Sequence, residues 1–138
     1  MTWKLATTKY HGKGGMIILE GVGKIPGLHG WSFHAARDIA DTPEQCEEWK
    51  DSIRGQGAWG GAFSDYYDGS NVGDFYDIVN STSAKDIYLY PRGCSGDMTK
   101  YFYGDTWCDF DLNVPVDGHI DITGTLTGTG QLFKSPGL

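Results

Sequence analysis

The sequence predicts a mainly β (α+β) fold, a β-sandwich or partly open barrel of about seven or eight short strands with one flanking helix. Runs that alternate apolar and polar residues recur along the chain and are separated by glycine- and proline-containing turns. Aromatic residues, which are enriched in strands, make up 14% of the chain, and 21 residues are glycine, which is enriched in tight turns. Only one stretch carries a full set of helix start and stop signals.

The helix is expected over about residues 43–54. Thr42 suits the N-cap, Pro43 suits the first helical position, and Gly55 is a natural stop. Acidic residues near the start and basic residues near the end match the helix macrodipole. Residues at i, i+3 and i+7 form one apolar stripe for packing against the strands: Cys46, Trp49 and Ile53.

Two strands are expected before this helix. The β-branched run 16–20 predicts a buried strand, and residues 31–35 alternate large apolar with small polar side chains, which predicts a half-buried strand. Residues 21–27 contain three glycines and a proline and are expected to form turns. Residues 1–14 are expected to form an N-terminal arm or an edge strand.

The remaining strands are expected after the helix. Residues 55–63 are rich in glycine but carry Trp59 and Phe63, which is typical of a strand with close backbone approaches. A short second helix is expected at about 72–79, followed by alternating strands at 86–90, 99–110 and 120–133. The alternation of the second of these strands is expected to continue, with Leu112, Val114 and Val116 on the same side as Phe110. Asp117-Gly118 is a hairpin signal between the last two, and residues 134–138 are expected to be a C-terminal tail. With no repeat and no linker, residues 1–138 are expected to form a single domain.

The charge and the cysteine content narrow the class of protein. The formal net charge of −7 argues against a grip on nucleic acid phosphates, which requires clustered cations. Three cysteines give no disulfide framework and indicate a reducing compartment. No signal-peptide pattern is present and the longest aliphatic run is too short for a membrane span, so a soluble protein made in the cytosol is expected.

Candidate chemical sites in the sequence are weak. The segment from Asp109 to Asn113 begins like a calcium loop, but Val114 stands where glycine is needed and Ile120 where the bidentate Glu is needed. Cys94 and Cys108 have no partner at zinc-ligand spacing, and the four histidines are scattered. We therefore expect no metal, no cofactor and no catalytic residues.

The order of the elements resembles the major tail tube proteins of tailed bacteriophages over about residues 14–133. The matching segments are Met16–Leu19, Ile25-Pro26-Gly27, Trp31-Ser32-Phe33, residues 38–42 leading into a helix, 72–79, 87–91, 101–104 and the glycine-bearing strand 117–132.

The resemblance implies a small β-sandwich with a flanking helix that assembles into hexameric rings. Inner sheets of neighbouring copies would join into one β-barrel around a channel, and stacked rings would form a tube through which the genome leaves the capsid. The implied partners are further copies of the chain, other tail proteins (tape measure, terminator or baseplate components) and DNA that passes without adhesion, with no membrane. The implied location is the virion tail, after synthesis in the host cytoplasm.

Within this hypothesis, polar residues of the last two strands are candidates for the channel wall. We expect them on a face turned away from the core, part of which lines the channel: Asp109, Asp111, Asp121, Thr123, Thr125 and Thr127. A negative channel would repel phosphates and let DNA slide.

Two alternatives remain at this stage. A β-sandwich rich in Trp, Tyr and Asp is also typical of a carbohydrate-binding or adhesin module. The candidates for its stacking platform are Trp59, Tyr66, Tyr67, Tyr88, Tyr90, Tyr101, Tyr103 and Trp107. A glycan-cleaving enzyme that uses two of the acids is a weaker alternative. Assembly state separates the three, because only the tube protein is expected to form rings or tubes.

Overall fold

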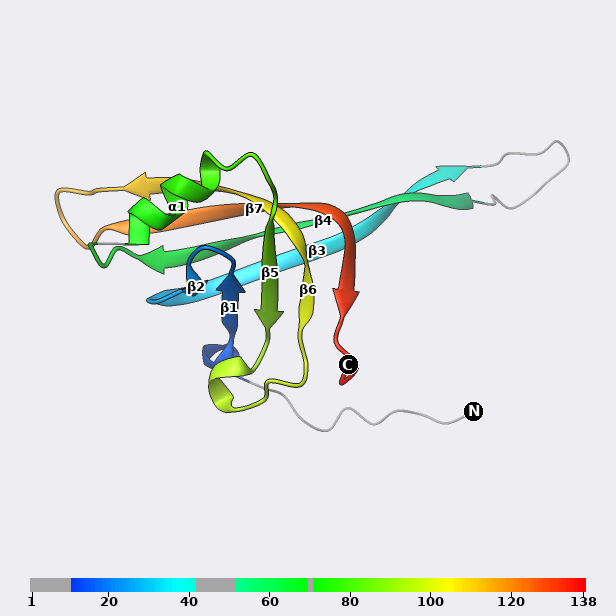
Figure 1. Cartoon of the computed structure of the whole chain (residues 1–138), viewed down its shortest axis with the longest axis horizontal. Helices are drawn as coiled ribbons and strands as arrows, with labels where there is room; N and C mark the ends of the chain where they lie inside the picture. The colour runs from blue at the N-terminus through cyan, green and yellow to red at the C-terminus, as the bar shows by residue number, and fades with distance from the viewer. Residues whose placement is uncertain (1–10, 42–51, 70) are drawn as a thin grey trace, which may run out of the picture.

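The computed structural model describes residues 11–41, 52–69 and 71–138 (Figure 1). In this part of the chain seven strands form one antiparallel sheet, accompanied by a single α-helix. The elements are β1 (Met16–Leu19), β2 (Gly23–Lys24), β3 (Leu28–Asp41), β4 (Ser52–Tyr66), α1 (Asn71–Val79), β5 (Lys85–Tyr90), β6 (Phe102–Asn113) and β7 (Asp121–Lys134), with 3₁₀ turns at Gly12–Gly14 and Gly93–Ser95. The mainly β prediction is confirmed, and the strands predicted from residue 16 onward each have a counterpart. Of the arm or edge strand predicted at 1–14, residues 1–10 lie outside the described residues.

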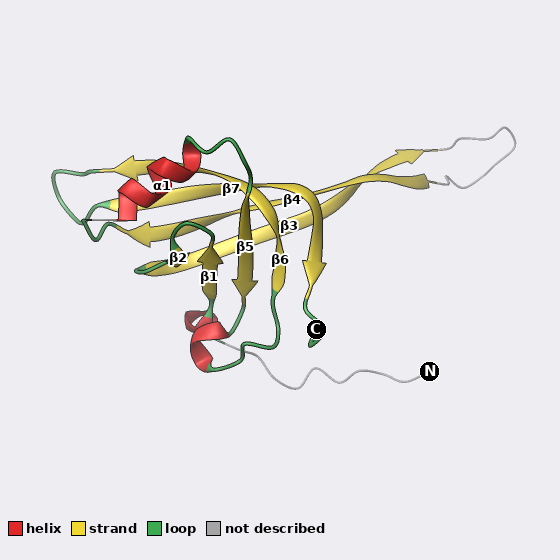
Figure 2. Ribbon diagram, viewed as in Figure 1, coloured by secondary structure: helices red, strands yellow, loops and turns green. Residues whose placement is uncertain are grey.

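The sheet has the strand order β2-β1-β5-β6-β7-β4-β3 and is bent over itself without closing into a barrel. One end of β6 and β7 runs along β4 and β3, and the other end turns to lie beside β5 (Figure 2). The bend coincides with a register shift between Tyr103 and Asp105, opposite Gly130, whose φ of 77° is left-handed. The two halves of the sheet therefore enclose the core between them.

The core centres on two aromatic side chains that lie over glycines of β7. Phe63 is 1% exposed, and its ring centroid lies 5.5 Å from that of Phe75 in α1. A methyl group at Gly124, the cross-strand partner of Phe63, would overlap the Phe63 ring. Trp59 covers Gly128 in the same way. Aromatic rings thus fill the space that these glycines leave open.

The short second helix predicted at 72–79 is confirmed as α1. Its Phe75 and Ile78 are buried and Val72 is half-buried, at a spacing of three residues that keeps them on one face. This face packs on the core side of β6, where the Phe75 and Phe110 centroids lie 6.2 Å apart. α1 therefore closes one end of the bent sheet.

The predicted helix at 43–54 is wrong for its last residues. β4 begins at Ser52, and Ile53 pairs with Ala40 of β3 rather than joining a helical stripe with Cys46 and Trp49. Cys46 and Trp49 lie outside the described residues. Pairing with β3 overrides the local helix signals at this point.

β3 and β4 continue beyond the rest of the sheet as a two-stranded arm. β4 pairs with β7 only from Gly60 to Tyr66, whereas its pairing with β3 begins at Ser52. We call residues 36–41 and 52–58 the arm, which projects from one end of the molecule in Figure 1.

The predicted C-terminal tail is anchored to the rest of the chain. Ser135 is buried, and its Oγ donates a hydrogen bond to the Thr99 carbonyl at 2.7 Å.

The thiol of Cys108 should be unreactive in the folded protein. Burial in the core, and then the charge of Asp109, raise the pKa of Cys108 to about 12, so the reactive thiolate is absent near neutral pH. A Cys46→Ser/Cys94→Ser variant is expected to resist a thiol reagent such as DTNB until denaturant is added. A Cys46→Ser/Cys108→Ser variant keeps the exposed Cys94 and should react at once. Equal rates for the two variants would contradict the buried position of Cys108.

Candidate functional surface

One face of β3, β4, β7 and β6 is polar, and it lies on the side of the sheet away from the core. The strand register aligns its residues in rows that cross all four strands. One row is Gly30, Ser64, Thr123 and Asp111, and the next is Ser32, Ala62, Thr125 and Asp109. We call these residues, together with His34, Gly60, Thr127 and Trp107 of the third row, the polar face.

The alternation of β7 sets the direction of its side chains. Ile122, Gly124 and Leu126 are buried, whereas Thr123, Thr125 and Thr127 between them are exposed. Asp109 and Asp111 are exposed on β6, directly opposite two of these threonines. Five of the six candidate channel residues therefore lie together on one surface. Its side chains are mostly small, and none of the residues that define it is Lys or Arg.

The sixth candidate, Asp121, has different surroundings. It is half-buried at the start of β7. Its Oδ1 lies 2.9 Å from His119 Nε2, close enough for an ion pair, but the two groups are not aligned for a hydrogen bond. The His119 ring also meets the edge of Tyr66, with centroids 4.9 Å apart. Asp121 thus contacts a histidine and is half-buried, whereas Asp109 and Asp111 are exposed.

Both edges of the sheet that carries the polar face are open in the described part of the chain. β3 is the last strand of the sheet and pairs only with β4. On the opposite side β5 pairs with β6 only as far as Thr106, so residues 107–113 pair with β7 alone. Each open edge presents backbone N–H and C=O groups that can pair with another strand.

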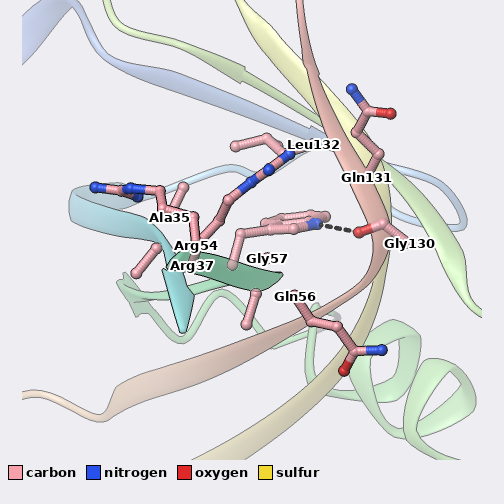
Figure 3. A pocket seen from close by; sticks show the side chains of 11 residues that line it. Ala35, Arg37, Arg54, Gln56, Gly57, Gly130, Gln131 and Leu132 are labelled. Carbon is pink, nitrogen blue, oxygen red and sulfur yellow. Dashed lines mark hydrogen bonds between the residues drawn. The ribbon is translucent and has the colours of Figure 1, made fainter. Parts of the chain in front are cut away.

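A groove of about 660 Å³ lies beneath the arm (Figure 3). Trp59, which directly follows the arm in β4, lines it, and its Nε1 donates a hydrogen bond to the Gly130 carbonyl at 3.2 Å, next to the bend of β7. Arg37 and Arg54, one from each strand of the arm, also line it. The sequence analysis missed both arginines, although Arg37 continues the alternation of Trp31, Phe33 and Ala35.

A second hollow of about 270 Å³ lies on the outer side of the bend. Tyr88, Tyr103 and Phe133 form a stacked row along it, with centroid separations of 5.9 and 5.3 Å. Rings this close cover part of one another's faces, which leaves less flat surface for a sugar. Beside the row, Asp86 and Asp105 face each other across β5 and β6.

This carboxylate pair should make stability depend on pH. The pKa of Asp86 lies above its ordinary value, first because its protonated carboxyl hydrogen-bonds to Asp105, then through desolvation and through the negative charge of Asp105. A raised pKa in the folded state stabilises the protein below the unfolded-state pKa, and that contribution is lost as the pH rises through the raised value.

The Asp105→Asn variant is therefore expected to unfold at a higher temperature than the parent protein at pH 7, because like charges no longer face each other. The difference should shrink as the pH falls toward about 4, where the carboxyls become protonated. Thermal unfolding followed by circular dichroism between pH 4 and 7 measures this. Asp77→Asn, on α1, is the control for the loss of one negative charge. If the unfolding temperatures of the two variants depend on pH in the same way, Asp86 and Asp105 are not coupled.

The described residues offer little for other chemistry. No group of three or more His, Cys, Asp or Glu among them could hold a metal ion. Within the same ranges, no helix has the length and apolar character needed to cross a membrane.

No family profile and no curated protein matches this sequence. Solved structures do match. The chain is similar to the tail of an empty gene transfer agent particle with C6 symmetry (TM-score 0.77, 13% identity, 91% of this chain and 98% of that one). It is also similar to the SPP1 tail tube (TM-score 0.73, 12% identity, 92% and 79%). A third match is the sheath/tube terminator of the extracellular contractile injection system PVC (TM-score 0.74, 12% identity, 95% and 99%). At these identities the similarities establish that the chain shares the fold of these tail proteins.

Proposed function

We propose that the chain is a structural virion protein that assembles into stacked rings, which form the tube of a phage tail and conduct the genome. It acts by assembly and not as an enzyme. The observation that carries the proposal is the pair of open edges on the sheet of the polar face, in a fold shared with tail tube proteins.

The open edge of one copy can pair with the opposite open edge of a neighbouring copy. β3 of one copy would pair with residues 107–113 of the next, so that the same two edges meet at every contact. A head-to-tail contact repeated by rotation closes into a ring, and closing a sheet in this way removes its free edges. The similar gene transfer agent tail has C6 symmetry, and we propose six copies for this ring as well.

In this ring the polar face lines the bore. Six copies carry a formal charge of about −42, six times −7, and Asp109 and Asp111 place part of it on the wall. DNA phosphates are repelled by such a wall, and the wall residues offer no lysine or arginine for them to bind. The bore thus favours passage over adhesion.

The remaining partners follow from this role. Other copies stack above and below each ring, and the tube ends on further tail components such as a terminator, a tape measure protein or a baseplate. Similarity to tube, sheath–tube and terminator chains supports this setting. The protein is then made in the host cytoplasm and resides in the virion tail.

Electron microscopy of the purified protein tests the proposal. Rings or tubes are expected in negative stain, at concentrations where a carbohydrate-binding module stays a monomer. A particle that remains monomeric at every concentration and binds a glycan array would replace the proposal with the carbohydrate-binding or adhesin alternative.

Amide hydrogen exchange identifies the strands through which neighbouring copies in a ring make contact. On ring formation, amides of β3 and of residues 107–113 should gain protection. β5 is the internal control, because β1 and β6 already flank it within one copy. Rings without new protection at the two edges would show that copies join in another way.

A further inference from the structure

We infer that the turn between β6 and β7, residues 114–117, docks into the groove beneath the arm of a second copy and thereby joins one ring to the next. The inference rests on the proposed tube function and adds the segments that hold stacked rings together.

The turn is apolar yet exposed. Val114 is 62% exposed and Val116 is fully exposed, next to Leu112 at 44%. Single exposed apolar residues are ordinary, but a contiguous group at the end of a hairpin is typical of a contact surface. Pro115 lies between the two valines and restricts the backbone, so the turn loses little conformational freedom on binding. The exposed Asp117 adds a negative charge at the same place.

The groove has the complementary properties. Trp59, Leu132 and Ala35 line it with apolar surface. Arg37 and Arg54 are two of only three arginines in a chain of net charge −7. Neither is joined by a hydrogen bond or an ion pair to the rest of the described chain. The groove therefore fits a partner that is apolar and carries a carboxylate, as the turn with Val116 and Asp117 does.

The turn lies at the end of the molecule opposite to the end from which the arm projects (Figure 1). The turn ends the polar-face strands on the side of α1, whereas the groove lies at the base of the arm. One copy is thus unable to place its own turn in its own groove. A contact between opposite ends repeats without closing, which produces an open-ended stack. Since the strands of the polar face run between these ends, the contact joins rings along the tube.

A charge swap tests the pairing. Asp117→Arg alone and Arg37→Glu/Arg54→Glu alone should each abolish long tubes and leave single rings, because like charges then meet at the contact. The variant that combines all three changes should recover tubes. Asp77→Arg changes the net charge as much as Asp117→Arg, lies on α1 outside the turn, and should stack normally.

Ring counts and tube lengths in negative stain separate the outcomes. Long tubes from Asp117→Arg, or no recovery in the combined variant, would overturn the docking inference while rings still support the proposed function. Loss of single rings in Asp117→Arg would also overturn it, because the contact would then lie within a ring. Absence of rings in the parent protein would refute the proposed function itself.

Disulfide trapping provides a measurement that does not depend on charge. In a Cys46→Ser/Cys94→Ser background, the pair Val116→Cys and Ala35→Cys should yield a ladder of linked copies on oxidation of assembled tubes. The pair Val116→Cys and Met98→Cys is a matched control with a second exposed site, and no ladder is expected from it. A ladder from the control alone, or from neither pair, would contradict the docking.

Discussion

Replacing Phe63 with alanine is expected to lower the free energy of unfolding by about 3–5 kcal/mol. The Phe63 ring is 1% exposed, lies against Phe75, and fills the space that Gly124 leaves open on β7. Alanine would remove contacts to a helix and to a strand at once, and the backbone of β7 is held by β4 and β6 and is unable to collapse fully into the cavity. Chemical denaturation of the unassembled protein measures the loss.

Tyr76→Ala is the control for this prediction, because Tyr76 lies on α1 beside Phe75 but is 60% exposed. Its effect should stay within about 0.5 kcal/mol, as for most surface changes. A similar loss in both variants would mean that α1 as a whole, and not the packing of Phe63 under it, sets the stability of this end of the sheet.

In the proposed tube, changing both Asp109 and Asp111 to lysine is expected to produce a bore that holds DNA at low salt. Each change shifts the formal charge of a copy by +2, so the formal charge of a six-copy ring moves from about −42 to about −18, with all the new cations on the polar face. Assembled tubes of this variant should bind short duplex DNA at about 50 mM salt and release it as salt rises, because phosphate contacts release counterions. Tubes of the parent protein should not bind.

The control places the same charge elsewhere. Asp74→Lys/Asp77→Lys alters two exposed acids of α1, away from the polar face, and should leave DNA binding absent or weak. If this variant binds DNA as well as the Asp109/Asp111 variant, net charge alone explains the effect and the polar face is not the wall of the bore. Salt titration by fluorescence anisotropy compares the two.

The polar face was predictable because strand periodicity is local. Once residues 120–127 form a strand, Ile122 and Leu126 must point to one side and Thr123 and Thr125 to the other. α1 was predictable for the same reason, since the spacing of Phe75 and Ile78 defines an apolar helical face within nine residues. In both cases the information lies inside a single element.

Pairing between distant segments was not predictable in this way. Good capping signals around Thr42 favoured a helix through Ile53, yet β3 supplies partners to residues 52–54 that local signals do not contain. The groove combines Arg37, Arg54 and Leu132, which are far apart in the chain and meet only because the bend of β7 returns beside the arm.

The amino-acid sequence alone determined which residues of β7 face the core and which face outward, together with the acidic character of the outward surface. The tertiary structure decided the order of the strands, and with it the two edges that stay open and the groove beneath the arm. The physical reason is that side-chain direction follows from backbone geometry over a few residues, whereas strand order depends on hydrogen bonds and packing between segments that no local pattern specifies.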